Sequence, residues 1–340
     1  MNDLATIEKV IPNIGGALKR AAELFDSVHS FADIERVFLR GQGLSPNTYR
    51  AYLTSVKQFY SFTNGLNPLQ VTPADIERFY DDLIAHVDRN TAYLRIRGLK
   101  KFFAGIRNVL PIYTSPFEIM PKKLQRKLNT TKKGNRTKAA LTDHEINALL
   151  AFLRADSTLK GKQNYAAMYM LVTSGLRASE LCSLRWHDIE NVDGAWSARF
   201  IGKGNKEAEQ ELYASAIETV RDTFRAQFRR QPTPDEALFW TVPQFKGDTP
   251  RAMPYHTLWY RVKEAGENAK KAEVIQRDIQ FTPHLFRRSY ATALYRSGMK
   301  IKAIQEKTRH ASIDTLVKHY IHDEEPATPY LDKVFGSIYV

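Results

Sequence analysis

The sequence predicts a mainly α-helical protein with a small β-hairpin, and three observations indicate that it has two domains. Its 340 residues exceed what one hydrophobic core usually organises. Apolar side chains recur at helical spacing through most of the chain, whereas the alternation typical of strands is clearest in residues 195–213. Residues 119–142 carry eight basic and no acidic side chains, which is typical of a linker.

Composition narrows the class of protein. Hydrophobic residues make up 43% of the chain, which is enough for folded cores. Cys182 is the single cysteine, so neither an internal disulfide nor a thiolate metal cluster can form, and a reducing compartment fits best. No run of eighteen apolar residues and no signal-like N-terminal segment occur, so we expect a soluble cytoplasmic protein, associated with the nucleoid if it binds DNA.

The charge balance indicates a polyanionic partner. Lys and Arg outnumber Asp and Glu by 50 to 37, and the pI is about 9.6. Residues 1–140 hold 22 basic and 12 acidic side chains, whereas the rest hold 28 and 25. The excess therefore lies in the first part of the chain. Nucleic acid and a membrane surface both fit this charge, and charge alone does not choose between them.

The first part of the chain, residues 1–125, is predicted to be helical. Residues 1–40 have weak helical periodicity and are expected to form a peripheral arm before a helical domain at 41–125. Ser45-Pro46 and Thr72-Pro73 each combine a capping residue with proline at the first helical position, so helices are predicted to start there. A third helix is expected from about 90 to 109.

The third helix has one apolar and one basic face. An ordinary solvated face is the plain interpretation of such a charge run, and contact with DNA phosphates is the functional one. The basic linker that follows, expected at 126–140, favours the functional interpretation, because a flexible basic strap neutralises phosphates. The candidate DNA-binding residues are Arg89, Arg95, Arg97, Lys100, Lys101, Lys122, Lys123, Arg126, Lys132, Lys133, Arg136 and Lys138.

The second domain is expected at 141–325. Thr142 and Glu145 form the pattern of a capping box, which predicts a helix to about Arg154. An apolar helix at about 165–173 ends at Gly175, which suits a left-handed C-cap. The next helix carries Arg177 and Glu180 on one face, at a helix start.

Residues 195–213 predict two strands joined through the turn 202–206, with Lys203 at the rim of the hairpin. The turn lacks the spacing of a phosphate-binding loop, and a solvated turn lysine is the plain alternative for Lys203. A helix at about 214–230, a possible strand at 237–242 and a helix at 254–272 follow.

His284 and Arg287 lie one turn apart after the helix start at Thr282-Pro283, where free amides and the helix dipole favour an anion. An ordinary surface pair is the alternative. A zinc site is disfavoured, because His319 and His322 are the closely spaced pair and no cysteine accompanies them.

Several separate motifs together resemble the tyrosine recombinase, or phage-type integrase, family. SGLRASELCSLRWHDI resembles the box around the family's first arginine, and IGKGNKE resembles the hairpin lysine box. HLFRRSYAT resembles the H-x-x-R box, and RHASIDTLVKHYIH resembles the box with the last histidine and the nucleophile. The resemblance covers residues 141–325 in order and rough spacing, and the segment of about 40–125 is similar to the family's core-binding domain. It implies a two-domain DNA clamp.

The chemistry of these residues can be stated from their types. A tyrosine hydroxyl is a weak nucleophile at neutral pH, so Tyr320 needs a neutralised phosphate and a proton acceptor. Arg177 and Arg287 can neutralise the phosphate, His284 can accept the proton and His310 can donate to the phosphate. Glu180 is expected to orient its neighbours. The resemblance assigns Lys203 the protonation of the departing 5′-oxygen.

The resemblance further implies a covalent 3′-phosphotyrosine intermediate formed without a metal or nucleotide cofactor. It implies a homo-tetramer on double-stranded DNA with a specific site, with accessory proteins as possible additions. The apolar stripe of residues 326–340 suits a helix that docks into a neighbouring protomer, and packing within the same chain fits it equally well.

Two features depart from the family pattern. Arg309 stands where glycine is usual, and His310 and Tyr320 are ten residues apart rather than nine. One extra helical residue rotates a side chain by about 100°, so we expect a local shift of the helix start. Two other functions stay open at this point: a type IB topoisomerase, and a DNA-binding regulator without catalysis.

Overall fold

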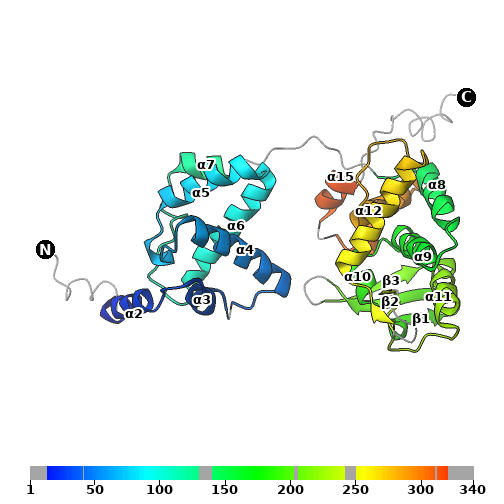
Figure 1. The fold of residues 1–340 in the computed structure, drawn as a ribbon, viewed down its shortest axis with the longest axis horizontal. Helices are drawn as coiled ribbons and strands as arrows, with labels where there is room; N and C mark the ends of the chain where they lie inside the picture. Colours follow the sequence, from blue (N-terminus) through cyan, green and yellow to red (C-terminus); the bar gives the residue numbers. More distant parts are fainter. Residues whose placement is uncertain are drawn as a thin grey trace, which may run out of the picture. The chain divides into compact units, whose positions relative to one another are not determined.

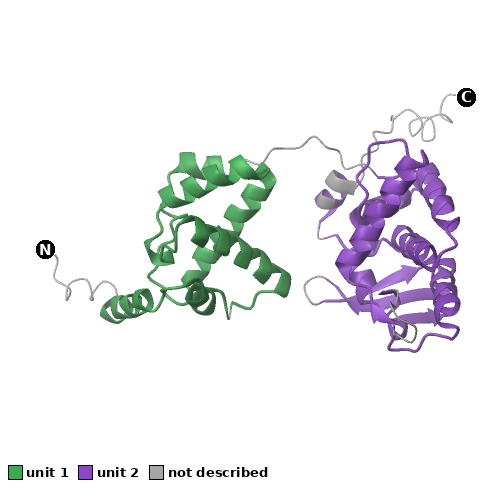
Figure 2. Ribbon diagram, in the orientation of Figure 1, with its two compact units in different colours: residues 1–135 green, residues 136–340 purple. Residues whose placement is uncertain are grey.

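The computed structural model describes residues 14–40, 42–129, 140–202, 206–241, 250–310 and 312–320, without the side chains of residues 14, 315 and 318–320. Two compact units divide the chain, Met1–Asn135 and Arg136–Val340 (Figure 2). No helix within the described ranges is both long and apolar enough to cross a bilayer.

Unit 1 is helical (Figure 1). Its helices start where the sequence predicts, because Ser45 caps α4 and Thr72 forms a reciprocal capping box with Asp75 at α5. The bounds are α2 (Ile14–Asp26), α3 (Phe31–Ile34), the π-helical turn η1 (Glu35–Leu39), α4 (Pro46–Phe62), the 3₁₀ turn η2 (Pro68–Gln70), α5 (Pro73–His86), α6 (Arg89–Ile106) and α7 (Lys122–Asn129).

The α6 helix is the centre of unit 1 and contacts η1, α4, α5 and α7. Its apolar face is buried, and Phe102 and Phe103 are nearly inaccessible to solvent. Phe102 packs edge to face on Phe38, and Phe103 does the same on Phe59, with ring centroids 6.2 and 6.1 Å apart. These contacts fix α6 in rotation, so its opposite, basic face points away from the core.

The core of unit 1 extends beyond the boundaries expected for the first domain. Residues 28–39 belong to the core of unit 1 and not to a peripheral arm, because Ile34 and Phe38 are buried in it. The linker does not begin at 126, because α7 continues to Asn129 and buries Leu124 and Leu128 against the same core. In both cases apolar side chains pack into a core that several helices of unit 1 share.

Unit 2 is mainly helical and contains two small antiparallel sheets. In the larger sheet, β1 (Ile189–Val192), β2 (Ala195–Ile201) and β3 (Glu207–Leu212) are antiparallel in that order; β4 (Trp240–Thr241) pairs with β5 (Arg251–Ala252). The helices are α8 (Asp143–Arg154), α9 (Leu159–Ser174), α10 (Ala178–Ser183), α11 (Ala214–Phe228), α12 (Tyr255–Lys271), α13 (Pro283–Arg296), α14 (Ile301–Thr308) and α15 (Ile313–Tyr320), with the 3₁₀ turn η3 (Trp186–Asp188).

The predicted hairpin is present: β2 and β3 pair from Trp196 with Leu212 to Ile201 with Glu207. The expectation missed β1, which joins β2 through a tight turn, and β5. The expected strand at 237–242 is reduced to β4 within the described part of the chain. Such short strands carry too few residues for their alternation to be visible in the sequence.

The α9 helix is the central helix of unit 2 and contacts α8, α11, α12, α13 and β3. It is buried on most sides, and it ends at Gly175, which adopts the predicted left-handed conformation with φ +63°. A left-handed residue turns the chain sharply, so α10 begins almost at once. Arg177 is the N-cap residue of α10 and therefore lies beside the end of α9.

The three C-terminal helices form a smaller cluster of their own. Ala291 of α13, Ile304 of α14 and Leu316 of α15 are fully buried against one another. Burying a leucine side chain contributes roughly 1.5–3 kcal/mol. Leu316 thus holds α15, the helix that ends at Tyr320, onto the helix that carries His284 and Arg287.

Candidate active site and nucleic-acid interface

Arg287 joins α13 to the start of α10. Its side chain is buried, with 1% of the residue exposed, and Nη1 donates to the carbonyl oxygen of Gly175 at 2.6 Å. His284, one turn earlier on the same helix face, is exposed. Thr282 occupies the predicted N-cap position, but its side chain makes no capping hydrogen bond. The helix therefore brings a buried guanidinium group and an exposed imidazole to one corner.

Arg177 and Glu180 are linked at the start of α10. Nη1 of Arg177 lies 2.6 Å from Oε1 of Glu180, and the backbone N–H of Arg177 donates to Oε2 at 2.8 Å. Burial by itself raises the pKa of the Glu180 carboxyl, but the Arg177 N–H and the guanidinium groups of Arg309 and Arg177 outweigh it and hold this pKa below its usual value. Glu180 is thus a buried carboxylate that stays ionised.

Arg309, which stands where glycine is usual in the family, belongs to this site, although its sequence position alone predicted no role for it. Its Nη2 lies 2.8 Å from Oε2 of Glu180, and its carbonyl oxygen accepts from Nη2 of Arg177 at 3.2 Å. Its guanidinium group therefore joins the pair formed by Arg177 and Glu180. The signal available in the sequence was the loss of the usual glycine before His310.

His310 follows Arg309 and lies in a cationic, partly buried environment. Burial is the main cause that lowers the pKa of its imidazole to about 3, and the positive charges of Arg287 and Arg177 lower it further, followed by His284 and Arg309. The imidazole is consequently neutral at physiological pH. The charges that lower its pKa come from three separate segments: Arg177 at the start of α10, His284 and Arg287 on α13, and Arg309 at the end of α14.

The hydrogen bonds around His310 assign its tautomer. Nδ1 lies 2.6 Å from Oγ1 of Thr308, and the same hydroxyl lies 2.6 Å from the carbonyl oxygen of Ile304. A hydroxyl has one proton, so Thr308 donates it to Ile304 and accepts from Nδ1–H. Nε2 of the neutral ring then carries the lone pair. It becomes a donor to phosphate only after it takes up a proton.

The side chains of two predicted catalytic residues, Lys203 and Tyr320, lie outside the described part of the chain. Lys203 lies outside the described residues, although Gly202 and Lys206 at the two ends of its turn are joined by an N–H to carbonyl hydrogen bond of 2.7 Å. Tyr320 is the last residue of α15, and its side chain lies outside the described part. Arg309 closes α14 in the left-handed conformation, and α15 starts at Ile313. His310 and Ser312 therefore lie between these two helices and not within one continuous helix.

The arrangement suits an anion. Three guanidinium groups, those of Arg177, Arg287 and Arg309, surround a neutral imidazole, and Glu180 accepts from two of them. Arginine forks match the oxygens of a phosphate and strengthen in a partly buried site. We call Arg177, Glu180, Arg287, Arg309 and His310 the arginine–histidine site.

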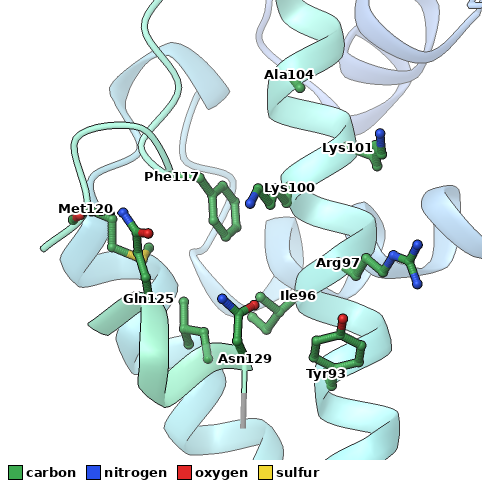
Figure 3. A pocket seen from close by; sticks show the side chains of 11 residues that line it. Tyr93, Ile96, Arg97, Lys100, Lys101, Ala104, Phe117, Met120, Gln125 and Asn129 are labelled. Atoms are coloured by element: carbon green, nitrogen blue, oxygen red, sulfur yellow. Dashed lines mark hydrogen bonds between the residues drawn. The ribbon is translucent and has the colours of Figure 1, made fainter. Parts of the chain in front are cut away.

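The basic face of α6 lines a hollow in unit 1. The hollow has a volume of about 410 Å³ and lies between α6, α7 and the segment that carries Phe117 and Met120. In Figure 3, Lys100 extends from α6 toward Phe117, whereas Arg97 and Lys101 extend from the other side of the helix. The structure thus brings these three predicted DNA-binding residues onto neighbouring turns, and all three are exposed.

Five of the other predicted DNA-binding residues lie on α6 and α7 of unit 1. Arg89 is exposed at the start of α6, Arg95 is half-buried, and three more are exposed on α7, namely Lys122, Lys123 and Arg126. Four lie outside the described residues: Lys132, Lys133, Arg136 and Lys138.

Lys127 on α7 is a basic residue that forms ion pairs within unit 1. Its Nζ lies 2.9 Å from both Oε1 of Glu77 and Oδ2 of Asp81 on α5. Hydrogen bonds to Asp81 and Glu77 raise its pKa. Lys127 therefore anchors α7 to α5 and has its charge neutralised within unit 1.

A helical basic unit followed by a mainly helical unit with a small β-hairpin and an arginine–histidine site is the arrangement expected of the tyrosine recombinase class. The chain belongs to the phage integrase family: that family's model matches residues 139–326, more than half of the chain. The N-terminal SAM-like domain of phage integrases matches residues 33–108. This match starts before residue 41, in agreement with the burial of Ile34 and Phe38.

Proteins of known family and structure are similar over most of this length. A tyrosine recombinase XerC of Roseiflexus sp. is 25% identical over 286 residues, 81% of this chain and 83% of its own. A tyrosine recombinase XerA of Pyrococcus furiosus is 27% identical over 279 residues, with 82% and 84% covered. Membership in this family makes the chain a tyrosine site-specific recombinase, an enzyme that cleaves and rejoins DNA.

Two solved structures share the fold. XerH site-specific recombinase bound to palindromic difH substrate superposes with a TM-score of 0.63 at 18% identity, over 95% of this chain and 89% of that chain. A lambda integrase dimer bound to a COC′ core site gives a TM-score of 0.60 at 20% identity, over 87% and 95%. Both relatives are seen on specific DNA sites.

Proposed function

We propose that the arginine–histidine site binds the scissile phosphodiester of a specific duplex DNA site and that Tyr320 attacks it. The observation that carries this proposal is that Arg177 and Arg309 both bond Glu180, while Arg287 bonds the Gly175 carbonyl group two residues before Arg177. Burial and the charges of Arg287, Arg177, His284 and Arg309 lower the pKa of His310 beside them. Cations gathered around a neutral ring repel one another, and an entering phosphate relieves that repulsion. The site is thus prepared for an anion.

The proposed cleavage exchanges one bond from phosphorus to oxygen for another. The Tyr320 oxygen forms a bond to phosphorus while the bond from phosphorus to the 5′-oxygen breaks. His284 accepts the phenolic proton, and Lys203 gives a proton to the departing 5′-oxygen. The products are a 3′-phosphotyrosine and a free 5′-hydroxyl, and attack by another 5′-hydroxyl reverses the step on a new strand.

The arginines and His310 act on the phosphate itself. Arg177 and Arg287 donate to its non-bridging oxygens and stabilise the charge that develops in the pentavalent transition state. A phosphate beside His310 raises the pKa of the imidazole, so Nε2 takes up a proton and becomes a donor. Glu180 holds Arg177 in place, as their 2.6 Å ion pair supports.

The place of Tyr320 in the chain supports its role as nucleophile. Tyr320 is the last residue of α15, about one turn after Leu316. Leu316 is buried against Ala291 of α13, the helix that also carries His284 and Arg287. The end of α15 is therefore tied to the phosphate-binding helix, which suits attack at that phosphate.

Unit 1 is proposed to hold the duplex through the basic face of α6, the exposed lysines of α7 and the basic residues after 129. The domains we propose are a core-binding domain from about 28 to 129, a basic linker to 140 and a catalytic domain at 141–325. Exposed Lys100 and Lys101, with no acidic residue in the first turn of α6, support contact with phosphates.

We propose further that the enzyme recombines DNA as a homo-tetramer in the cytoplasm, where chromosomal DNA is available, and that residues 326–340 contact a neighbouring protomer. The dimeric lambda integrase on its core site supports assembly on DNA in this family. Joining strands of two duplexes needs four cleavages and hence four sites.

A suicide substrate tests the proposal directly. The protein is incubated with genomic fragments that carry nicks, so that cleavage near a nick releases a short 5′-ended strand and traps the covalent complex. We expect a protein–DNA adduct that survives denaturation, whose sequenced ends define the target site.

Tyr320→Phe removes the nucleophile and is expected to abolish the adduct, whereas Tyr255→Phe, a change at an exposed tyrosine in the same unit, is expected to keep it. An adduct that persists in Tyr320→Phe sinks the assignment of the nucleophile. Supercoil relaxation by the monomer without a specific site would instead favour a topoisomerase.

A further inference from the structure

Arg309 adopts a backbone conformation that disfavours its own side chain. It closes α14 as a left-handed C-cap with φ +51° and ψ +47°. For a residue other than glycine this conformation is strained, because Cβ crowds the neighbouring backbone. Glycine would occupy the position without this strain, so the contacts of the Arg309 side chain have to offset it.

The side chain of Arg309 is held on three sides. Nη2 lies 2.8 Å from Oε2 of Glu180, and Nη1 donates to Oε1 of Gln210. The guanidinium carbon lies 4.9 Å from the centre of the Phe200 ring, in the geometry of a cation–π contact. With 17% of the side chain exposed, these contacts are largely desolvated and correspondingly strong.

These contacts connect parts of the site that are far apart in sequence. Phe200 and Gln210 lie on β2 and β3, the two strands of the hairpin. Glu180 lies on α10, and the Arg309 carbonyl oxygen accepts from Arg177 at 3.2 Å. One residue therefore fixes the hairpin and the phosphate-binding Arg177 relative to each other, immediately before His310.

Arg309 also changes the charge balance at Glu180. Arg177 bonds Oε1 of this carboxylate and Arg309 bonds Oε2. If Arg309 were absent, the full negative charge of Glu180 would act on Arg177 and weaken its attraction for phosphate. With Arg309 present, the negative charge of Glu180 is shared between two guanidinium groups. Arg177 therefore keeps more of its positive charge for the phosphate.

We propose that Arg309 is a positioning residue for DNA cleavage. It acts through Glu180, Gln210 and its own backbone carbonyl group rather than by touching the phosphodiester. This inference rests on the proposed role of Arg177 in phosphate binding. It predicts that Arg309 sets the rate of strand cleavage more than the affinity for DNA.

The test measures DNA affinity and single-turnover cleavage separately in Arg309→Gly and Arg309→Lys. Because a misplacement of about 1 Å can slow a reaction by about a hundredfold, Arg309→Gly is expected to slow cleavage by about that factor. Its dissociation constant for DNA is expected to change less than about threefold. Arg309→Lys keeps the charge but cannot bond Glu180 and Gln210 as a fork, so it is expected to restore cleavage in part.

Arg229→Gly is the matched control. Arg229 also closes a helix, α11, in the left-handed conformation with φ +58°, and it is exposed on the surface. The two glycine variants relieve the same backbone strain, so both indicate by their thermal unfolding whether the fold is kept. Arg229→Gly is expected to cleave DNA at the rate of the unmodified protein.

The outcomes separate this inference from the proposed function. Cleavage within about threefold of normal in Arg309→Gly, measured at the same DNA occupancy, would overturn the positioning role. Equal losses in affinity and rate would overturn it too, because they indicate direct DNA contact. If the unmodified protein forms no more adduct than Tyr320→Phe on any of the nicked fragments, the proposed function fails instead.

Discussion

The side chain of Arg287 donates from Nη1 to the carbonyl oxygen of Gly175, 112 residues earlier, at 2.6 Å. This bond fastens α13 to the turn between α9 and α10, which places Arg177. The two arginines proposed to hold one phosphate thus have their relative position set by a backbone carbonyl group. Gly175 presents that group because it is left-handed.

Gly175→Ala is expected to destabilise unit 2 and slow DNA cleavage. A Cβ atom at this position would lie 2.2 Å from Cδ1 of Tyr290, and φ is +63°. Left-handed strain and overpacking together cost roughly 2–4 kcal/mol. Chemical denaturation gives the free energy of unfolding, and the suicide substrate gives the cleavage rate.

Gly194→Ala is the control for the change at Gly175. Gly194 has φ +85°, and an added Cβ there meets nothing within 4 Å, so strain without a clash costs about 1 kcal/mol. Equal losses of stability in the two variants would contradict the role assigned to the contact with Tyr290.

The stability of unit 2 is expected to depend on His310 in acid. In the folded protein its pKa is lowered from 6.5 to about 3, mainly by burial. Between these values the unfolded chain binds more protons, so the contribution of the neutral ring is fully present above pH 6.5 and is lost as the pH falls toward 3.

Thermal unfolding between pH 7 and pH 4 checks this dependence, with His310→Gln expected to lose less stability on acidification than the unmodified protein. His256→Gln, a change at an exposed histidine of the same unit, serves as the control. Parallel curves for the unmodified protein and His310→Gln would show that the imidazole is not held neutral by the fold.

DNA affinity is expected to fall steeply with salt, and the basic face of α6 to carry part of that slope. Each phosphate contact contributes about 0.9 to the slope of log K against log salt, so glutamine at Arg97, Lys100 and Lys101 together should lower it by about 2–3. Fluorescence anisotropy over a range of salt concentrations measures the slope.

Lys127→Gln is the matched control for this measurement. Lys127 is also a lysine of unit 1, but its charge is neutralised by Glu77 and Asp81. Its replacement should leave the salt slope unchanged and lower stability slightly. If Lys127→Gln also lowered the slope by about 0.9, the share expected of one phosphate contact, the result would argue against a specific phosphate-binding face on α6.

Cys182 is expected to be chemically inert in the folded protein. Burial raises the pKa of its thiol to about 12, so at pH 8 only about one thiol in ten thousand is ionised. Alkylation by iodoacetamide, followed by mass spectrometry, should be slow in buffer and fast in denaturant. Rapid modification of the native protein would contradict the raised pKa of this half-buried thiol.

Local sequence patterns determined much of this fold. The capping boxes at Thr72 and Thr142, the left-handed Gly175 and the pairing of the hairpin strands follow from neighbouring residues, because caps and turns are built within a few positions. The order of the boxes likewise identified Arg177, His284, Arg287, His310 and Tyr320 as candidates, since residue type and spacing are visible in the chain.

The tertiary structure decided what those residues do to one another. The resemblance to the family places Arg309 where glycine is usual, but only the fold brings it to Glu180, 129 residues away, and to Gln210. The burial of Ile34 and Leu128 and the lowered pKa of His310 were decided in the same way. Desolvation and charge coupling depend on distances through space, and local periodicity does not contain them.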